Sequence, residues 1–380
     1  MARFLEIVVA FLLVAALGVV VALFLPSHRS YTHAVETNRP INVVFDMLNG
    51  FQRFNDWNHM KVIDPNVQFT LSGPASGVGA RLEFRSSNPR IGSGSWEIIE
   101  SVPGERIVFA LDTPTMGHNK TMRFRFERTG RQQRNVEISK RYRVEYGWNL
   151  IGRFAGIYVA SNMGRQVQLS LRTLNNALAG IPRVDYTLYP HPFEVVDLPA
   201  RNVLQVEVQA PLADDGVAVS MTNQRQWMDR VMAANNLVAD GPLRIVTLDR
   251  SSESYTFIMQ LPVRDAEAPE GASSAPSVAE LPALQVAITG EGNTVTFAQT
   301  PPLRAASTKW IGPAPGLQRV RDTIRAWALV RGLVPEPGAQ GFDDYRVAIA
   351  DMLGPEAEFQ AFVPLAAATA PLVAAAPAAP

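Results

Sequence analysis

The sequence predicts an α+β protein with an N-terminal transmembrane helix, a helix-grip antiparallel sheet with a long C-terminal helix, and a duplicated βαββ domain. Three observations carry this prediction. Residues 7–27 hold no charged side chain, six short alternating segments lie between residues 67 and 146, and residues 192–365 contain an internal repeat. A chain of 380 residues is long enough for two domains of ordinary size.

The first element is the apolar run IVVAFLLVAALGVVVALFLPS, residues 7–27. At a rise of 1.5 Å per residue it spans about 31 Å, which matches the hydrocarbon core of a bilayer. A cleaved signal peptide is the alternative, but it would have a shorter apolar region and an A-x-A-like site. We therefore expect residues 1–28 to be a transmembrane anchor.

The orientation of the anchor is poorly determined, because Arg3 and Arg29 flank it on opposite sides. The expectation is a single-pass protein of a bacterial inner membrane. An arrangement with the N-terminus in the cytoplasm and the soluble domains in the periplasm is favoured.

After the anchor the periodicity changes to that of short strands. YTHAVET alternates, Pro40 opens a short helix at INVVFDMLNG, and Gly50 ends it. The six segments that follow are VQFTL, ARLEF, SWEIIE, RIVFAL, KTMRFRFER and NVEISKRYRVEY. From Trp148 to Leu178 the pattern becomes helical, and its predicted apolar stripe contains Leu150, Phe154, Ile157, Tyr158, Val167, Leu171, Leu174 and Leu178.

The loop SGPASGVGA, residues 72–80, lies between two of these strands. Its spacing, G-x-x-x-G-x-G, is neither that of a Walker loop nor that of the dinucleotide fingerprint, and a strand rather than a helix follows it. The loop is predicted to be a hairpin connection whose glycines supply positive φ angles.

The order of these elements resembles that of the SRPBCC superfamily, the START or polyketide-cyclase-like helix-grip fold. So does the local sequence, in which FQRFNDWNHM is followed by DPNVQFTLSGPASGVGARLEF. The resemblance covers about residues 31–180, within a domain expected at residues 29–180. It implies a cavity between helix and sheet that holds an apolar molecule or lipid, with or without catalysis. Trp57, Trp96 and Trp148 are candidate lining residues, and plain core packing is the competing interpretation.

Residues 181–191 carry prolines and are expected to be a linker. An internal repeat follows within residues 192–365. Its first half is the strand VLQVEVQAP, a helix at NQRQWMDRVMAANNLV, and the strands RIVTLDR and SYTFIMQLPV. Its second half is, in the same order, the strand LRAASTKWIGPAP, a helix at LQRVRDTIRAWALVRGLV, and the strands DYRVAIA and EFQAFVPL. Duplication of a strand-helix-strand-strand unit implies one sheet with a pseudo-twofold axis. Residues 263–281 are expected to be a flexible insertion, and residues 366–380 a disordered Ala/Pro-rich tail.

Residues 192–365 resemble the GyrI-like, or AraC-type effector-binding, domain. VVDLPARNVLQVEV resembles the opening of that family, Gly312-Pro313 matches its Gly-Pro step, and FDDYRVAIA matches the segment that carries an acidic residue and a tyrosine. Asp343 replaces the usual Glu, and Ala314 replaces an aromatic residue. The resemblance implies an organic-cation site, for which the candidate ligand contacts are Asp343, Tyr345, Trp310, Trp227 and Tyr255. Packing of the sheet against its helices is the competing role.

Composition excludes several classes of site. The charges balance, with 35 Lys+Arg against 35 Asp+Glu, so no overall field favours nucleic acid. There is no cysteine, and the five histidines have no metal-ligand spacing. We expect no metal, no cofactor and no nucleic-acid partner.

Three functions remain. The favoured one is a membrane-anchored binder of small hydrophobic or cationic organic ligands, not an enzyme. The second is a polyketide cyclase-like enzyme, for which His59, Glu97, Asp112 and His118 are candidate acids or bases. The third is an interaction or envelope protein without a ligand. The identity of the ligand and the oligomeric state are not encoded in any motif.

Overall fold

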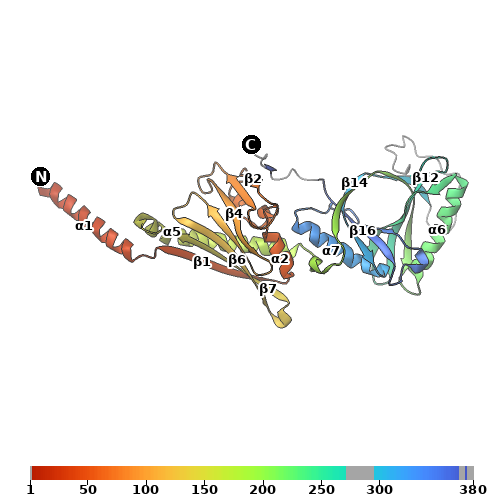
Figure 1. Ribbon diagram of the computed structural model, residues 1–380, viewed down its shortest axis with the longest axis horizontal. Coiled ribbons are helices and arrows are strands. Elements are labelled where there is room, and N and C mark those ends of the chain that lie inside the picture. The colour runs from red at the N-terminus through yellow and green to blue at the C-terminus, as the bar shows by residue number, and fades with distance from the viewer. Residues whose placement is uncertain (1, 271–294, 368–372, 375–380) are drawn as a thin grey trace. The chain divides into compact units, whose positions relative to one another are not determined.

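The computed structural model describes residues 2–270, 295–367 and 373–374, and the chain forms two compact units (Figure 1). The first unit contains the chain up to Asp185 together with residues 330–332 and 373–374, and the second contains the described residues among 186–329 and 333–367. Both are built around an antiparallel sheet with helices, so the α+β prediction is confirmed.

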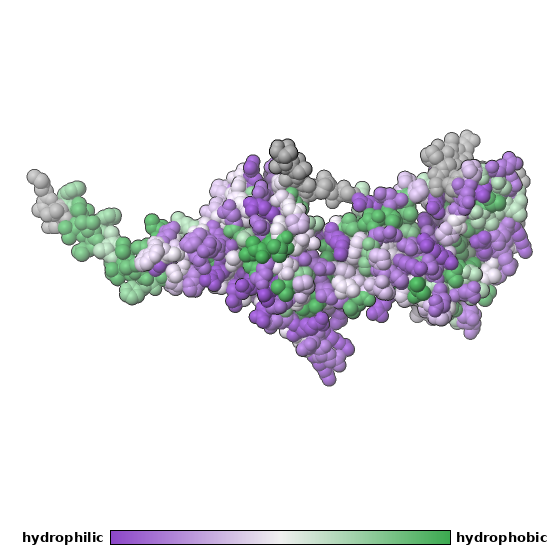
Figure 2. Space-filling view, in the orientation of Figure 1, coloured by the Kyte–Doolittle hydropathy of each residue, from purple (hydrophilic) through white to green (hydrophobic). Residues whose placement is uncertain are grey.

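The N-terminal helix α1, Ala2–Phe24, is the predicted apolar helix. Its segment Ile7–Phe24 is long and apolar enough to cross a membrane, and only 6% of that segment is buried. Figure 2 shows this helix as a stretch of hydrophobic surface. A signal sequence would have the same properties, so the helix itself does not distinguish an anchor from a leader.

The sheet of the first unit has the strand order β1-β7-β6-β5-β4-β3-β2-β17, and every pairing except β17 with β2 is antiparallel. Its strands are β1 His28–Thr37, β2 Gln68–Ser72, β3 Arg81–Arg85, β4 Ser93–Val102, β5 Arg106–Asp112, β6 His118–Thr129, β7 Asn135–Glu145 and β17 Val373–Ala374. The six strands predicted between residues 67 and 146 are confirmed. The short helices α2 Ile41–Leu48, α3 Phe54–Trp57 and α4 Met60–Ile63 connect β1 to β2.

The long helix α5, Leu150–Ala179, packs against β1 and β7 and completes the helix-grip arrangement (Figure 1). In its C-terminal half the predicted stripe is confirmed, and the buried residues are Val167, Leu171, Leu174 and Leu178. In its N-terminal half the stripe is wrong at Phe154, which is exposed. Gly152 and Gly156 pack against the ring of Tyr146 there, because only residues without a side chain allow that approach. The side chains of Ile157 and Tyr158 lie outside those described.

The glycine-rich loop connects β2 to β3, as predicted. Gly73, Gly77 and Gly79 have φ angles of 76°, 81° and 88°, in the left-handed region that favours glycine. A Cβ atom on Gly73 would lie 2.3 Å from the carbonyl oxygen of Gly79, so this position also needs glycine for space.

The second unit contains one sheet with the order β13-β9-β12-β11-β15-β16-β14-β8, and β10 pairs with β12 beside it. Its strands are β8 Phe193–Leu198, β9 Arg201–Pro211, β10 Leu237–Ala239, β11 Leu243–Arg250, β12 Ser254–Asp265, β13 Thr296–Thr300, β14 Leu303–Ile311, β15 Phe342–Tyr345 and β16 Glu358–Pro364. Its helices are α6 Gly216–Ala234 and α7 Leu317–Val330. Short 3₁₀ turns lie at Arg131–Gln133, Tyr186–Leu188, Ala314–Gly316 and Ile349–Asp351.

The predicted duplication is visible in the strand order. Exchanging β13, β9, β12 and β11 with β8, β14, β16 and β15 gives the same strand order read from the opposite edge of the sheet, so the pseudo-twofold axis passes between β11 and β15. The strand before each repeat pairs with the opposite half: β8 pairs with β14, and β13 pairs with β9. The two halves therefore close one continuous sheet.

Three predicted boundaries need correction. Strand β12 continues to Asp265, so residues 263–265 are paired with β10 and are not part of a flexible insertion. Residues 271–281 of that insertion lie outside the described residues. Strand β15 ends at Tyr345, so DYRVAIA is only partly a strand. In the predicted tail, Val373–Ala374 pair with β2, and residues 368–372 and 375–380 lie outside the described residues.

Candidate ligand-binding cavities

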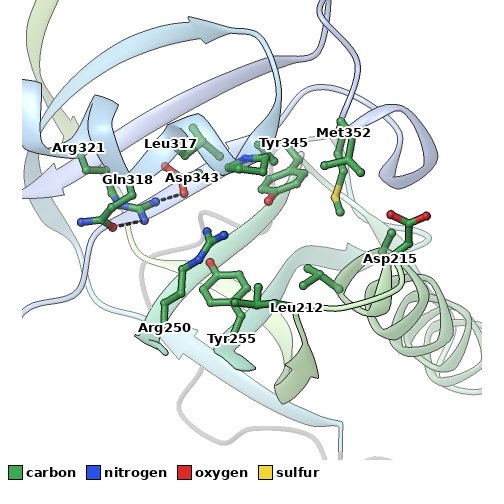
Figure 3. A pocket seen from close by; sticks show the side chains of 15 residues that line it. Leu212, Asp215, Arg250, Tyr255, Leu317, Gln318, Arg321, Asp343, Tyr345 and Met352 are labelled. Atoms are coloured by element: carbon green, nitrogen blue, oxygen red, sulfur yellow. Dashed lines mark hydrogen bonds and ion pairs between the residues drawn. The ribbon is translucent and has the colours of Figure 1, made fainter. Parts of the chain in front are cut away.

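A cavity of about 150 Å³ lies in the second unit, and both repeats contribute to its walls (Figure 3). The first repeat supplies residues of α6, of the segment before it, and of β11 and β12; the second supplies residues of α7, β15 and the turn after it. The lining residues include Leu212, Arg250, Tyr255, Leu317, Arg321, Asp343, Tyr345 and Met352.

Strand β15 divides its four buried residues between two faces, since successive side chains of a strand point to opposite sides. Asp343 and Tyr345 line the cavity. Asp344 lies on the other face, where Arg244 donates two hydrogen bonds to it at 2.7 and 3.2 Å. The guanidinium of Arg244 also stacks on the ring of Phe342, with 4.2 Å to the centroid.

Asp343 is 1% exposed and forms a buried ion pair with Arg321 of α7 (Figure 3). Arg321 donates from Nη1 to Oδ2 of Asp343, and its Nη2 donates to Gln318 at 2.9 Å. The second carboxylate oxygen, Oδ1, is buried and has no hydrogen-bond partner among the described residues. Burial raises the pKa of Asp343 to about 6, against the opposing effect of Arg321.

Two phenol rings face the same space as Asp343 (Figure 3). Tyr255 of β12 shares a hydrogen bond with the hydroxyl of Thr247 at 2.9 Å, whereas Tyr345 packs edge-on against Phe359. Burial raises the pKa of both phenols, so they are neutral hydrogen-bonding groups at pH 7. The exposed Arg250 lies near them, with its guanidinium 5.5 Å from the centroid of the Tyr255 ring.

Two of the predicted contacts in this unit do not line the cavity. Trp310 packs on the turn after β14, where Gly312 and Gly316 leave room for its indole and Nε1 donates to the carbonyl of Pro313 at 3.2 Å. Trp227 lies on the outer surface of α6, with the guanidinium of Arg230 4.6 Å from its ring. Asp343, Tyr345 and Tyr255 are the predicted residues that the fold brings together.

A second cavity, of about 110 Å³, lies within the first unit. It is lined by residues of α4 and the two residues before it, of β3, β4, β5, β6, β7 and α5, and of the segments 90–91 and 113–115. Among them are His59, Phe84, Trp96, Thr113, Met122, Lys140, Tyr142, Gln166 and Val167. Lys120 holds the segment 113–115 at its wall, because its Nζ donates to the carbonyls of Thr113 and Thr115 at 2.7 and 2.5 Å.

The three tryptophans predicted for this unit have three different positions. Trp96 lines the cavity and is 5% exposed. Trp57 is fully buried in an aromatic cluster with Phe54 and Phe124, at centroid distances of 5.0 and 5.6 Å, so it belongs to the core. Trp148 is 84% exposed and lines neither cavity.

Of the predicted acids and bases, His59 lines this cavity and the other three do not. Glu97 pairs with Arg81 on β3, and Asp112 and His118 are exposed near strand ends. Burial lowers the pKa of His59 to about 4, so the imidazole is neutral at pH 7. Within the described residues, no group of three His, Asp or Glu side chains could hold a metal ion.

The sequence prediction missed Arg321, Arg250 and Lys140. Lys140 left a readable signal: it occupies an inward position of the alternating strand NVEISKRYRVEY, where Ile138 and Tyr142 are the neighbouring buried residues. Arg321 left none, because its pairing with a strand 22 positions away depends on the tertiary fold.

Comparisons with known proteins give structural likenesses only, since no family model and no curated protein matches the chain. The C-terminal domain of EcmrR is 13% identical, with a TM-score of 0.34, and the match covers 47% of this chain and 99% of that one. A hydrolase from Listeria innocua is 11% identical, with a TM-score of 0.32 and coverage of 46% and 91%. A truncated norcoclaurine synthase from Thalictrum flavum is 10% identical, with a TM-score of 0.32 and coverage of 40% and 94%.

Proposed function

We propose that the protein is a membrane-anchored binder of small apolar or amphipathic molecules, with a ligand cavity in each of its two soluble units. The observation that carries the proposal is Asp343 Oδ1, a buried acceptor without a partner in a cavity walled by two phenols. A buried polar atom left unpaired costs free energy. A ligand that donates a hydrogen bond to this oxygen would recover that cost.

The cavity of the second unit suits a flat molecule with an N–H or O–H donor. Its rings, Tyr255 and Tyr345, would contribute about 0.5–2 kcal/mol each to an organic cation. Arg321 already neutralises the carboxylate of Asp343, so we expect any preference for a cationic ligand over a neutral one of the same shape to come from the rings of Tyr255 and Tyr345. A ligand of about benzene size fits a cavity of this volume.

The membrane part of the proposal rests on α1, whose 18-residue apolar segment is almost entirely uncovered by the rest of the unit. An uncleaved apolar helix of this length is stable in a bilayer and would be an aggregation liability in water. The soluble units would then remain attached to the membrane surface.

Screening the full chain in phospholipid nanodiscs tests the function. Lipids, aromatic polyketides and organic cations are added one at a time, and native mass spectra and thermal unfolding are recorded. A ligand at 100 times its dissociation constant should stabilise its unit by about 2.7 kcal/mol. Tyr345→Leu should weaken an aromatic ligand of the second unit, whereas Tyr31→Leu, in the first unit, should leave that affinity unchanged.

The screen can also contradict the proposal. If no compound produces a mass adduct or moves an unfolding transition, the chain does not act as a small-molecule binder, and the alternative of an interaction or envelope protein replaces it. Equal loss of affinity in Tyr345→Leu and Tyr31→Leu would remove the second-unit cavity from the binding site.

A further inference from the structure

Lys140 is the feature of the first unit that its packing leaves unexplained. It lies on β7 at an inward position, and it is only 3% exposed. Its Nζ donates to the hydroxyl of Ser170 on α5 at 2.6 Å and lies 5.4 and 5.2 Å from the ring centroids of Trp57 and Phe124. A buried ammonium is normally paired with a carboxylate, because burying an uncompensated charge is costly.

Among the described residues that line the same cavity as Lys140, no carboxylate takes that role, because none of them is Asp or Glu. The two charged side chains that line it, Lys140 and Arg90, are both cationic. Arg90 adds a second positive charge, and the buried Nε1–H of Trp96 has no hydrogen-bond partner among the described residues. The cavity therefore presents positive charge and an unused donor, and lacks a matching anion.

We propose that this cavity binds a small organic acid, with its apolar part against Phe84, Met122 and Val167 and its carboxylate accepting from Lys140 Nζ. The Nε1–H of Trp96 is the second donor available to that carboxylate. This inference rests on the proposed binding function and adds the chemical class of the ligand for the first unit. A charge-assisted hydrogen bond in a buried site is about twice as strong as a neutral one.

The titratable groups around the site give the inference a pH signature. Burial lowers the pKa of Lys140 to about 7, so the amine is only half protonated at neutral pH without a ligand. A bound carboxylate favours the protonated amine, so binding takes up a proton above pH 7. His59 is neutral above pH 5 and Tyr142, with a pKa raised by burial to about 12, is neutral below pH 11. Arg90 is the other charged side chain that lines this cavity.

The test uses benzoate and benzamide, which have nearly the same shape and differ in charge. Binding to the full chain in phospholipid nanodiscs is measured by titration calorimetry, with empty nanodiscs as the blank. We expect benzoate to bind at least about tenfold more tightly than benzamide at pH 6.5. Its affinity should fall about 50-fold between pH 7 and pH 9, the loss of protonated amine for a pKa of about 7, while that of benzamide stays constant.

Three variants assign the effect. Lys140→Met should abolish both the preference for benzoate and its pH dependence, and leave benzamide binding intact. Lys61→Met removes an exposed lysine of α4 and should change neither. Trp96→Phe keeps an aromatic ring and removes the N–H donor, and should weaken benzoate binding several-fold. Calorimetry in two buffers of different ionisation enthalpy should show that the binding of benzoate takes up nearly one proton at pH 8, and that this uptake is absent in Lys140→Met.

Equal affinity for the two probes overturns the inference, as does a pH dependence that persists in Lys140→Met. Failure of both probes to bind overturns it as well, but leaves the proposed function to the separate screen, which reports on both units. A charge preference lost in Lys140→Met and kept in Lys61→Met supports it.

A different observation concerns the exposed apolar turn at residues 148–154, where α5 begins. Trp148 lies just before the helix and Ile151 and Phe154 lie in its first two turns, and these side chains are 84%, 73% and 37% exposed. Between them, Arg153 donates from Nη1 to the carbonyls of Ala22, Leu23 and Leu25 at 3.2–3.3 Å. The exposed apolar turn is thus held beside the C-terminal end of α1.

We infer that this turn contacts the lipid bilayer. A transmembrane α1 would bring the membrane surface to its own end, where Arg153 fixes the turn. Tryptophan is the residue most typical of the lipid headgroup region, and Ile and Phe would enter the apolar boundary. The occupant of this surface is therefore the membrane that α1 spans, and this inference rests on the proposed anchor.

Fluorescence in nanodiscs of brominated phospholipid tests the contact, since bromine quenches only nearby tryptophan. In the full chain, a fraction of the tryptophan fluorescence should be quenched. This quenched fraction should disappear in Trp148→Ser and persist in Trp227→Ser, which removes a tryptophan of α6. Unchanged quenching in Trp148→Ser, with the chain still in the nanodisc, overturns the lipid contact. A chain that does not enter nanodiscs overturns the anchor too.

Discussion

Lys140 and Asp343 show how single buried charges set the chemistry of the two cavities. Each lies on a strand at a position that faces a cavity. Asp343 has Arg321 as its partner, whereas the contacts of Lys140 Nζ within the described part of the chain are a hydroxyl and two rings. Burial disfavours the charged form in both cases, so the pKa of Asp343 rises and that of Lys140 falls. Both groups consequently titrate within about one unit of neutral pH.

The lysine makes the stability of the first unit depend on pH. Its pKa is about 7 in the folded chain and 10.5 when exposed, so between these values the unfolded chain binds more protons. The free energy of unfolding should therefore rise as pH increases from 7 to 10, by on the order of a few kcal/mol. Denaturant titrations across this range measure it; Lys140→Met should remove the rise, and Lys61→Met should keep it.

The buried ion pair of Asp343 and Arg321 gives a prediction for the stability of the second unit. Asp343→Asn would leave Arg321 buried without its anionic partner, which costs about 3–5 kcal/mol. The double variant Asp343→Leu with Arg321→Met removes both charges and should recover most of that loss. Thermal unfolding of the unchanged protein, Asp343→Asn and the double variant measures these differences. A double variant as unstable as Asp343→Asn would show that the ion pair itself stabilises the unit, and that the loss in Asp343→Asn does not come from the unpaired Arg321.

At the scale of elements, the glycine loop separates two reasons for needing glycine. Gly73 and Gly77 both have positive φ, but only Gly73 lacks space for a Cβ atom. Gly77→Ala should cost about 1 kcal/mol of unfolding free energy from backbone strain alone. Gly73→Ala should cost clearly more, because its Cβ would meet the Gly79 carbonyl. Equal losses in chemical denaturation would refute the steric part. Residues 73–79 do not line the first-unit cavity, so neither variant should change ligand affinity.

The periodicity of apolar residues was enough to predict the helices and strands, but it predicted only some of the contacts that these elements make. Alternation identified the strands of the first sheet, and the stripe of α5 holds where aliphatic residues such as Leu171 and Leu174 meet the sheet. It fails at Phe154, because the close approach of Gly152 to Tyr146 turns that helix face outward, a packing detail that no local pattern encodes. The repeat, by contrast, was enough to predict one continuous sheet, because two copies of the same strand-helix-strand-strand unit pair with each other about a pseudo-twofold axis.

The candidate site was predictable in part, and only from the resemblance to effector-binding domains, which named Asp343 and Tyr345. These residues are two positions apart on β15, so the strand places both on the cavity side. The tryptophans were poorer guides: Trp310 is held on a turn by Gly312, and Trp148 is exposed. Large aromatic residues serve core, turn and surface alike, and only the tertiary fold decides which.

For the whole molecule, the anchor is the property to test first. After alkaline extraction the chain should stay in the membrane fraction, because α1 would be held by about 18 apolar residues rather than by charge. Deletion of residues 2–24 should release it. Recovery of the intact chain in the supernatant would exclude a spanning helix, and an N-terminus that begins after residue 24 in the mature protein would identify a cleaved leader. Reporter fusions at the C-terminus would report which side the soluble units occupy.

The connection between α1 and β1 consists of residues 25–27 only, and Arg153 binds the carbonyl at its start. Four peptide steps reach at most about 14 Å, so a spanning α1 would confine the first unit to the surface layer of the membrane. Its cavity would then sample molecules at their local concentration in that layer rather than in bulk water. For lipid-soluble acids this enrichment makes a weak site sufficient, since occupancy depends on concentration relative to the dissociation constant. Lengthening the connection with Gly-Ser repeats should lower occupancy without altering intrinsic affinity.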